Sequence, residues 1–330
     1  MAPATSGFHH GFQAFAVDFS TQVEPIPALL TGADNGILRQ LLALTHGKPR
    51  VAVEVHQLPN LENHCTLGTR INSGTSALIY SGHMKGSNVP VAIKVFDPHL
   101  METRPIAWHC RQDDVSTRLR LFHREFTALS SLNNEGVPSA PTVFGLCKHE
   151  ISPGLWVPAI VMGFLDKFPK KLTPDLLLSI VRAVAALHER GLIHGDLKED
   201  HLMMRPQSKQ VVLVDHGLQG ESCIGRGTPD YIPLAEMFEC SMARDVYSLG
   251  VCIYKLIFNV LPFEAFSLEQ RLYHEPPHLD LFSRYSRLNS FVATMIADMM
   301  SAPLDRRPQN AMIVEHRLRK ALVELANSSS

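Results

Sequence analysis

Two acidic residues in polar stretches that follow apolar runs are the best candidates for chemistry in this chain. Asp196 lies within residues 194–201, HGDLKEDH, and Asp215 follows the short apolar run that ends at Val214. A hairpin between these two stretches would bring both carboxylates together. Such a pair can hold a divalent cation and orient a hydroxyl group for phosphoryl transfer.

Residues 194–201 resemble the catalytic loop of the protein kinases, H-R-D-L-x-x-x-N, and residues 215–217, DHG, resemble the D-F-G motif. The resemblance implies ATP as the phosphoryl donor, with Asp196 accepting or orienting the proton of the attacking hydroxyl group. Lys198 would neutralise charge on the transferred phosphoryl group, and Asp215 would hold Mg²⁺. A lysine two residues after the aspartate is similar to the Ser/Thr-directed kinases, so the expected substrates are Ser and Thr hydroxyls of proteins.

Three positions depart from the family pattern. Gly195 stands where an arginine would receive an activation-loop phosphate, so we expect that switch to be absent. His201 replaces the asparagine that holds a second metal ion, and its imidazole suits Mg²⁺ poorly, whereas Mn²⁺ accepts nitrogen more readily. His216 replaces the phenylalanine of D-F-G. The alternative function is therefore a pseudokinase, a nucleotide-binding or scaffold module with weak or no catalysis.

A β-rich stretch precedes these motifs, with strands predicted at 65–71, 77–84 and 90–96. Residues 91–94, VAIK, match the third strand of the kinase family, which implies that Lys94 contacts nucleotide phosphates and a glutamate on the next helix. Glu125 is the candidate partner, because it lies beside an apolar stripe at helical spacing. The turn before residue 77 is comparable with the glycine-rich loop, although an ordinary hairpin is the better explanation of that turn taken alone.

Residues 161–166, VMGFLD, resemble the strand and hinge that join the two kinase lobes. The resemblance implies that Met162 guards the back of the adenine pocket and that Ala92 lies against the adenine ring. The complete set of nucleotide-binding residues implied in this way is Asn72, Gly74, Ala77, Ile79, Ala92, Lys94, Glu125, Met162, Phe164 and Leu165.

Further segments of the family pattern follow in the expected order. Residues 227–231, GTPDY, resemble the substrate-binding segment and contain Thr228. Glu236 stands for the glutamate of A-P-E, with one extra residue before it. Asp245 opens a D-x-x-S-x-G pattern, and Arg307 of the late R-P pattern is the candidate partner of Glu236. The order of these segments disfavours a small-molecule kinase, a third interpretation of the HGD sequence.

The expected fold is α+β, the bilobal protein-kinase fold, with a small N-lobe of antiparallel sheet plus one helix and a larger, mainly helical C-lobe. Thr173 before Pro174 predicts a helix start, and Gly191 predicts its end. Later helices are predicted at 245–258, 288–300 and 310–325. The predicted organisation is an N-terminal extension at 1–61, partly disordered, a kinase domain at 62–323 (N-lobe 62–162, hinge 163–166, C-lobe 167–323) and a tail at 324–330.

Composition narrows the class of partner. The net charge of −1 gives no support for a nucleic-acid partner, and the most apolar run, 249–261, is too short to span a membrane. Six scattered cysteines without a C-x-x-C pair predict reduced thiols. No signal peptide is recognisable, so we expect a cytoplasmic protein whose partners are protein substrates or a regulated partner protein.

Overall fold

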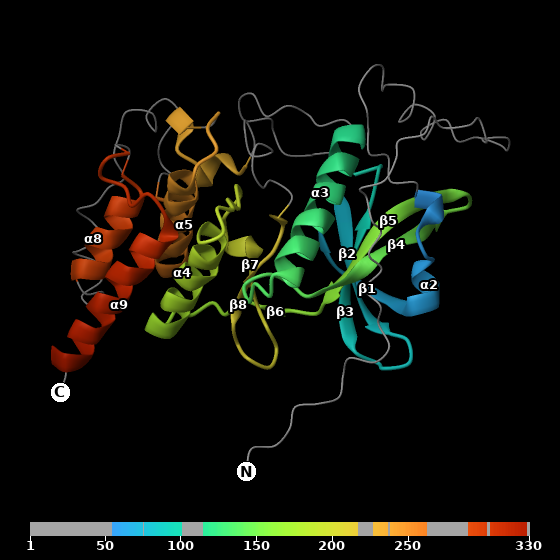
Figure 1. Ribbon diagram of the computed structural model, residues 1–330, viewed down its shortest axis with the longest axis horizontal. Coiled ribbons are helices and arrows are strands. Elements are labelled where there is room, and N and C mark those ends of the chain that lie inside the picture. Colours follow the sequence, from blue (N-terminus) through green and yellow to red (C-terminus); the bar gives the residue numbers. More distant parts are fainter. Residues whose placement is uncertain are drawn as a thin grey trace, which may run out of the picture. The chain divides into compact units, whose positions relative to one another are not determined.

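The computed structural model describes residues 55–74, 76–100, 115–216, 227–236, 238–262, 290–301 and 304–328 (Figure 1). The chain divides into two compact units, of which the first comprises Met1–Met101 and Val143–Gly163 and the second Glu102–Thr142 and Phe164–Ser330. Most of the predicted N-terminal extension, residues 1–54, lies outside the described residues.

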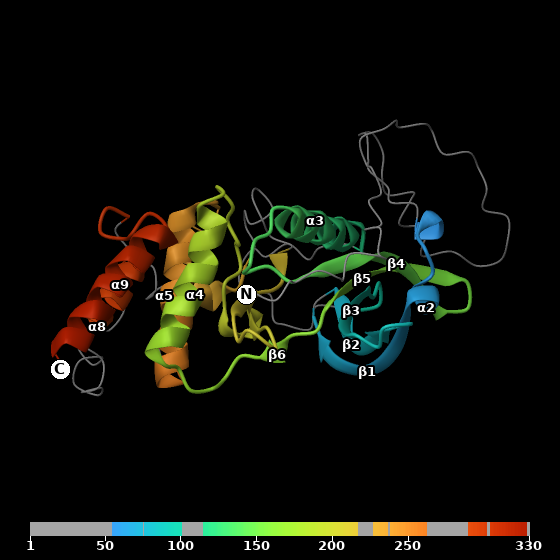
Figure 2. The ribbon, with the colours of Figure 1, turned by 60° about the horizontal axis from the view of Figure 1, so that its bottom comes forward.

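The first unit contains a five-stranded antiparallel sheet (Figure 2). Its strands follow the order β1-β2-β3-β5-β4 across the sheet, so the chain leaves after the third strand and returns at the far edge. Alternating β-branched and apolar residues favour these strands, because their side chains pack on a pleated surface. The strands are β1 (Cys65–Ser73), β2 (Ala77–Met84), β3 (Pro90–Phe96), β4 (Val143–Ser152) and β5 (Leu155–Gly163).

A short segment before β1 is an integral part of this unit. It contains the 3₁₀ helix η1 (Val55–Gln57) and the helix α2 (Leu61–His64). Asn60 forms a parallel bridge with Lys148 of β4, and the Lys148 N–H donates to the Pro59 carbonyl at 2.9 Å. Leu58 and Leu61 are buried. The packed part of the unit therefore begins before residue 62, which the sequence motifs predict as the start of the kinase domain.

We expect Leu61→Ala to lower the free energy of unfolding by about 2 kcal/mol, because it removes buried methyl groups and leaves a cavity. Leu61 is 1% exposed. Urea denaturation of the full chain measures the effect. Leu67→Ala is the matched control, since Leu67 is 38% exposed on β1 and its loss should stay within about 0.5 kcal/mol. Equal losses in both variants would show that the segment before β1 does not contribute to stability.

The second unit is mainly helical, and one buried apolar cluster joins its helices. The helices α4, α5, α8 and α9 lie side by side in both views (Figures 1 and 2). Thr173 caps α4 as predicted, accepting a hydrogen bond from the Leu176 N–H at 3.3 Å. Gly191 follows the helix with φ +72°, a conformation that favours glycine. The helices are α3 (Val115–Asn134), α4 (Pro174–His188), α5 (Met242–Phe258), α8 (Ser290–Met299) and α9 (Ala311–Ser328).

The second unit also contains a small sheet, ordered β6-β7-β8, from β6 (Asp166–Lys167), β7 (Leu202–Met204) and β8 (Val211–Leu213). The 3₁₀ helix η2 (Glu199–His201) leads into β7. Two further 3₁₀ turns, η5 (Pro229–Tyr231) and η6 (Leu234–Glu236), precede α5. These short elements position the polar loops on which the sequence motifs lie.

The helix predictions hold, with small shifts at the ends. The last helix α9 continues to Ser328, beyond the predicted tail boundary at 324. Among the described residues, no helix combines the length and apolar character needed to cross a membrane. Cys65, Cys147 and Cys252 are free thiols, whereas Cys240 is disulfide-bonded. The expectation of a reduced thiol is wrong for Cys240, because spacing in the sequence does not reveal which thiols meet in the fold.

Candidate active site

The hairpin of β7 and β8 brings the two acidic stretches together. Leu202 pairs with Leu213, so the residues before β7 and after β8 lie at the same end of the hairpin. The Val214 N–H donates to the His201 carbonyl at 3.0 Å and extends this pairing by one step. The predicted meeting of the Asp196 and Asp215 loops is therefore present in the structure.

The carboxylate of Asp196 is held in one orientation. Its Oδ1 accepts hydrogen bonds from the Thr228 N–H and hydroxyl group, both at 2.8 Å. Lys198 Nζ lies 3.3 Å from Oδ2 of Asp196 and donates to the Thr228 hydroxyl at 3.0 Å. Burial alone would raise the pKa of Asp196, but the charges of His201 and Lys198 and the Thr228 hydrogen bond hold it below its usual value. Asp196 is thus an oriented, ionised acceptor.

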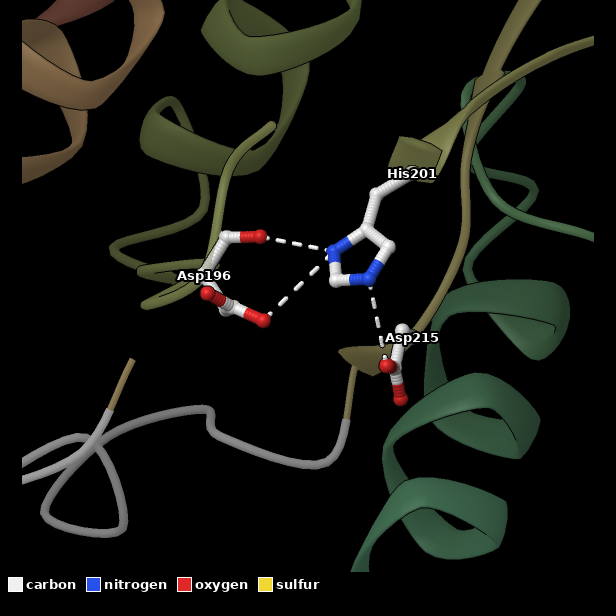
Figure 3. A group of neighbouring side chains, drawn as sticks. All are labelled: Asp196, His201 and Asp215. Atoms are coloured by element: carbon white, nitrogen blue, oxygen red, sulfur yellow. Dashed lines mark hydrogen bonds and ion pairs between the residues drawn. The ribbon is translucent and has the colours of Figure 1, made fainter. Parts of the chain in front are cut away.

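His201 lies between the two aspartates (Figure 3). Its Nδ1 lies 2.7 Å from the backbone carbonyl oxygen of Asp196 and 3.7 Å from Oδ2 of the same residue, whereas Nε2 lies 3.3 Å from Oδ2 of Asp215. Within the described part of the chain, these three residues offer ligand atoms within 4.8 Å of one another. Asp215 has a φ of +67°, uncommon for a residue with a side chain and typical of strain at functional sites. The donor set fits a divalent cation.

Asp245 at the start of α5 fixes the backbone of the catalytic loop. Its Oδ2 accepts from the His194 N–H at 2.6 Å, and its Oδ1 accepts from the Gly195 N–H at 2.9 Å. His188 Nε2 donates to Oδ2 at 3.2 Å, while its Nδ1 accepts the Ala311 N–H at 2.9 Å. Burial alone would raise the pKa of Asp245, but the hydrogen bonds from His188 and from the Gly195 N–H hold it below its usual value. The sequence motifs indicate Asp245 but not its hydrogen-bond partners.

His194 and His216 are fully buried behind the loop, with ring centroids 5.0 Å apart. His194 Nε2 donates to the Val214 carbonyl at 3.1 Å, and His216 Nε2 donates to the Leu213 carbonyl at 2.9 Å. Burial lowers the pKa of His216 to about 3 and also lowers the pKa of His194. His216 is therefore a neutral core residue that packs where the family has an aromatic ring.

Residues 227–231, which resemble the substrate-binding segment, contact the catalytic loop through a second residue, Tyr231. The sequence did not indicate this contact. The Tyr231 hydroxyl donates to Glu199, and Lys255 of α5 forms an ion pair with Glu199. Lys255 Nζ also donates to the Tyr231 oxygen at 3.1 Å. Burial and the hydrogen bond to Glu199 raise the pKa of Tyr231. Thr228 and Tyr231 together hold this segment against the loop.

The predicted pair of Glu236 and Arg307 is confirmed. Nη1 and Nη2 of Arg307 lie 2.9 Å from Oε2 and Oε1 of Glu236, respectively. Both residues are buried. The extra residue before Glu236 is accommodated, because η6 presents its carboxylate to Arg307.

Arg244 is a residue that the sequence analysis missed. It is buried on α5, and its Nη1 donates to the Glu239 carbonyl at 2.7 Å. A Cβ atom on Gly227, whose φ is +115°, would lie 3.0 Å from Nη2 of Arg244 and 3.2 Å from the Gly195 carbonyl oxygen. The guanidinium group therefore packs beside the glycine that precedes Thr228. In the sequence, Arg244 is a single charged residue directly before the pattern that Asp245 opens, and this position does not indicate such a role.

The first unit gathers most of the predicted nucleotide-binding residues on one sheet. Ile79 pairs with Asn72 on β1 and with Lys94 on β3, and Ala92 pairs with Met162 on β5. Paired residues and residues two apart share a face, so Ile79, Ala92, Lys94 and Met162 point the same way. The other face of β3 is core and consists of Val91, Ile93 and Val95.

The remaining predicted residues lie at ends of elements or in the second unit. The Gly74 N–H donates to the Ala77 carbonyl at 2.8 Å, which closes the turn between β1 and β2. Phe164 and Leu165 follow β5, and the second unit resumes at Phe164. Glu125 is buried on α3, which belongs to the second unit. Its contact with the β3 lysine stays a prediction.

The chain belongs to the protein kinase family, because the model of the protein kinase domain matches residues 65–318. Among curated relatives, it is 24% identical over 214 residues to CBL-interacting protein kinase 30 of Oryza sativa subsp. japonica, covering 61% of this chain and 43% of the relative. It is 24% identical over 264 residues to serine/threonine-protein kinase Aurora-1 of Arabidopsis thaliana, covering 76% and 84%. The Aurora kinase of Schizosaccharomyces pombe is 26% identical over 160 residues, covering 46% and 43%.

The chain thus spans less than half the length of the rice and fission yeast relatives. Membership of the family confirms the α+β kinase fold, which agrees with the antiparallel sheet followed by helices. The family generally uses ATP and a divalent metal ion to phosphorylate proteins.

Proposed function

We propose that the protein is an active kinase that transfers the γ-phosphoryl group of ATP to Ser or Thr hydroxyl groups of protein substrates. The observation that carries the proposal is the orientation of Asp196, held by Thr228 and facing Lys198. An ionised carboxylate fixed in this way can accept a hydroxyl proton as the phosphorus–oxygen bond forms.

The other residues have separate parts in this proposal. Lys198 carries a positive charge beside Asp196, where it would offset charge on the phosphoryl group in the transition state. Asp215 and His201 would hold the divalent cation, Mg²⁺ or Mn²⁺, which neutralises phosphate charge when bound. Lys94, in β3, would contact the nucleotide phosphates. Thr228 and Tyr231 would position the substrate-binding segment against the loop.

The second candidate is a pseudokinase that binds nucleotide without turning it over. The observation that favours it is the imidazole of His201, whose Nε2 lies 3.3 Å from Asp215 at a metal-binding position. Mg²⁺ prefers oxygen ligands in near-octahedral geometry, so a nitrogen there weakens its binding.

Transfer from labelled ATP, with Mg²⁺ and Mn²⁺ in parallel, separates the two candidates. Signal that vanishes in Asp196→Ala supports the active kinase, and higher signal with Mn²⁺ supports His201 as a ligand. No transfer with either metal, together with a rise in melting temperature on adding ATP, would favour the pseudokinase. Transfer that survives Asp196→Ala would contradict the role of Asp196.

We expect Thr228→Val to reduce phosphotransfer by about tenfold. The variant keeps the branched shape and the backbone N–H but loses the hydroxyl donor to Asp196, and hydrogen bonds to charged groups contribute about 1.5–3 kcal/mol. Steady-state kinetics with a generic protein substrate measures the change. Thr127→Val on the exposed part of α3, where the hydroxyl donates only to the His123 carbonyl, is the control and should retain full activity. Unchanged rates in both variants would rule out this role for the hydroxyl.

A further inference from the structure

We propose that Arg244 is a positioning residue, whose buried guanidinium group holds residues 227–231 against the catalytic loop. This contact keeps Thr228 bonded to Asp196 in the absence of any phosphorylation of the chain. The effect of Arg244 on phosphotransfer rests on the proposed function, whereas its effect on the position of residues 227–231 does not.

Gly227 is the point at which Arg244 meets the catalytic loop. Gly227 has a φ of +115° and Gly195 a φ of +84°, so both adopt backbone conformations that favour glycine. A Cβ atom on Gly227 would lie 3.0 Å from Nη2 of Arg244 and 3.2 Å from the Gly195 carbonyl oxygen. The guanidinium group and the loop carbonyl therefore both approach the glycine that directly precedes Thr228.

Nearby negative charge explains why a guanidinium group is stable at this position. Arg244 is 1% exposed, and a buried cation costs free energy unless acceptors and opposite charges surround it. Its Nη1 donates to the Glu239 carbonyl at 2.7 Å. Burial lowers the pKa of Arg244, whereas the carboxylates of Asp245, Asp196 and Glu236 act in the opposite direction. The fold thus supplies the negative charge that offsets Arg244.

This charge balance removes the need for a phosphate group beside the loop. Phosphorylation orders a segment when the added negative charge pairs with arginine side chains that lack a partner charge. At Arg244, carboxylates of the fold already provide that charge, and Gly195 adds no second cation to the loop. We therefore expect residues 227–231 to hold their position in the unmodified chain.

The helix α5 contacts the same segment again at Lys255. About three turns of helix separate Lys255 from Arg244, so the two side chains lie on one face of α5. Lys255 Nζ donates to the Tyr231 oxygen at 3.1 Å, and the Arg244 N–H donates to Ser241 Oγ at 3.1 Å, which fixes the first turn. Loss of Arg244 should therefore free the Gly227 end of the segment and leave the Tyr231 end in contact.

Hydrogen exchange on the full chain, treated with phosphatase and free of nucleotide, measures the structural effect. We expect Arg244→Met to speed deuterium uptake by about tenfold or more at the Thr228 N–H, which donates to Asp196. Uptake in the buried part of α4 should stay unchanged. Arg319→Met is the matched control, because it removes a 54% exposed arginine from α9, and it should exchange like the wild type.

Two further variants separate the charge of Arg244 from its packing. Methionine fills similar volume without charge, so Arg244→Lys should protect the Thr228 N–H better than Arg244→Met does. Gly227→Ala should also speed uptake at Thr228, because its Cβ atom would push apart the two groups that meet at Gly227. If Arg244→Met exchanges faster throughout α4 as well, Gly227→Ala decides, and unchanged Thr228 uptake there would overturn the proposal. Equal protection in the lysine and methionine variants, or a Thr228 amide that loses protection when the wild type is dephosphorylated, would overturn it too.

Kinetics then distinguishes this proposal from the proposed function. Arg244→Met should lower kcat by about tenfold or more, with a smaller loss in Arg244→Lys. The KM for ATP should stay within about twofold, because most of the predicted nucleotide-binding residues lie in the other unit. The expected exchange pattern without phosphotransfer in any variant would reject the proposed function and keep the role of Arg244. Phosphotransfer with unchanged kcat and unchanged Thr228 uptake in Arg244→Met would reject that role and keep the proposed function.

Discussion

Arg307→Met is expected to lower the free energy of unfolding by about 3–5 kcal/mol, because it leaves the buried carboxylate of Glu236 without its partner. Arg307 is 2% exposed and Glu236 is 4% exposed. The guanidinium group also donates to the Ser301 carbonyl at 3.0 and 2.8 Å and to the Ala243 carbonyl at 3.2 Å. A methionine fills similar volume but supplies no donor, so a carboxylate and two carbonyl groups lose hydrogen bonds together.

Urea denaturation with a matched exposed pair measures this effect. Arg317 lies 3.5 Å from Asp298, and the two side chains are 43% and 42% exposed. Arg317→Met should cost less than about 1 kcal/mol, since exposed ion pairs contribute little. The double variant Arg307→Met with Glu236→Gln should recover part of the loss, because it removes the buried charge. Similar losses in Arg307→Met and Arg317→Met would contradict the importance of the buried pair.

His216→Phe is expected to make the protein less sensitive to acid. The folded pKa of His216 is about 3 and the ordinary value is 6.5. Below pH 6.5 the unfolded chain binds a proton at this residue while the folded chain does not, so stability falls as pH decreases from about 6.5 toward 3. At pH 5 this single group costs about 2 kcal/mol relative to pH 7.5. Phenylalanine binds no proton in either state and removes this loss.

The free energy of unfolding at pH 7.5 and pH 5.0 tests the prediction. The decrease between these two values should be smaller in His216→Phe than in the wild type by about 2 kcal/mol. The substitution would leave the Leu213 carbonyl without its donor, which lowers stability at both pH values and cancels in the difference. His83→Phe is the control, because it places the same side chain at an exposed position of β2. Equal decreases in the wild type and His216→Phe would exclude a buried neutral His216.

The sequence predicted the elements well where local pattern decides structure. The strands β2 and β3 begin and end at the predicted residues, because turn residues bound alternating apolar runs. The cap at Thr173 was predictable, since its hydroxyl needs only the next turn of the same helix. The pair of Glu236 and Arg307 was predictable from family motifs alone, because 71 residues separate them.

The residues that the sequence missed act through tertiary contacts. His188 has the sequence context of an ordinary helix residue, and only the packing of α4, α5 and α9 brings its ring to Asp245 and Ala311. Lys255 interrupts an apolar helix in the sequence, yet it meets Glu199 of the catalytic loop. Local propensity contains no information on such pairings, because their partners lie far away along the chain. The buried segment at Leu58 was missed for the same reason.

The imidazole of His188 links the first turn of α9 to the catalytic loop through Asp245. The ring can accept the Ala311 N–H and donate to Asp245 only as one neutral tautomer, so both bonds depend on a single proton position. Local opening of the α9 N-terminus therefore removes the Ala311 N–H from His188, the residue that donates to Asp245, whose Oδ1 accepts the Gly195 N–H. Deuterium uptake at Ala311 and Gly195 should follow one shared opening event, although their positions are 116 residues apart (311 − 195) in the chain.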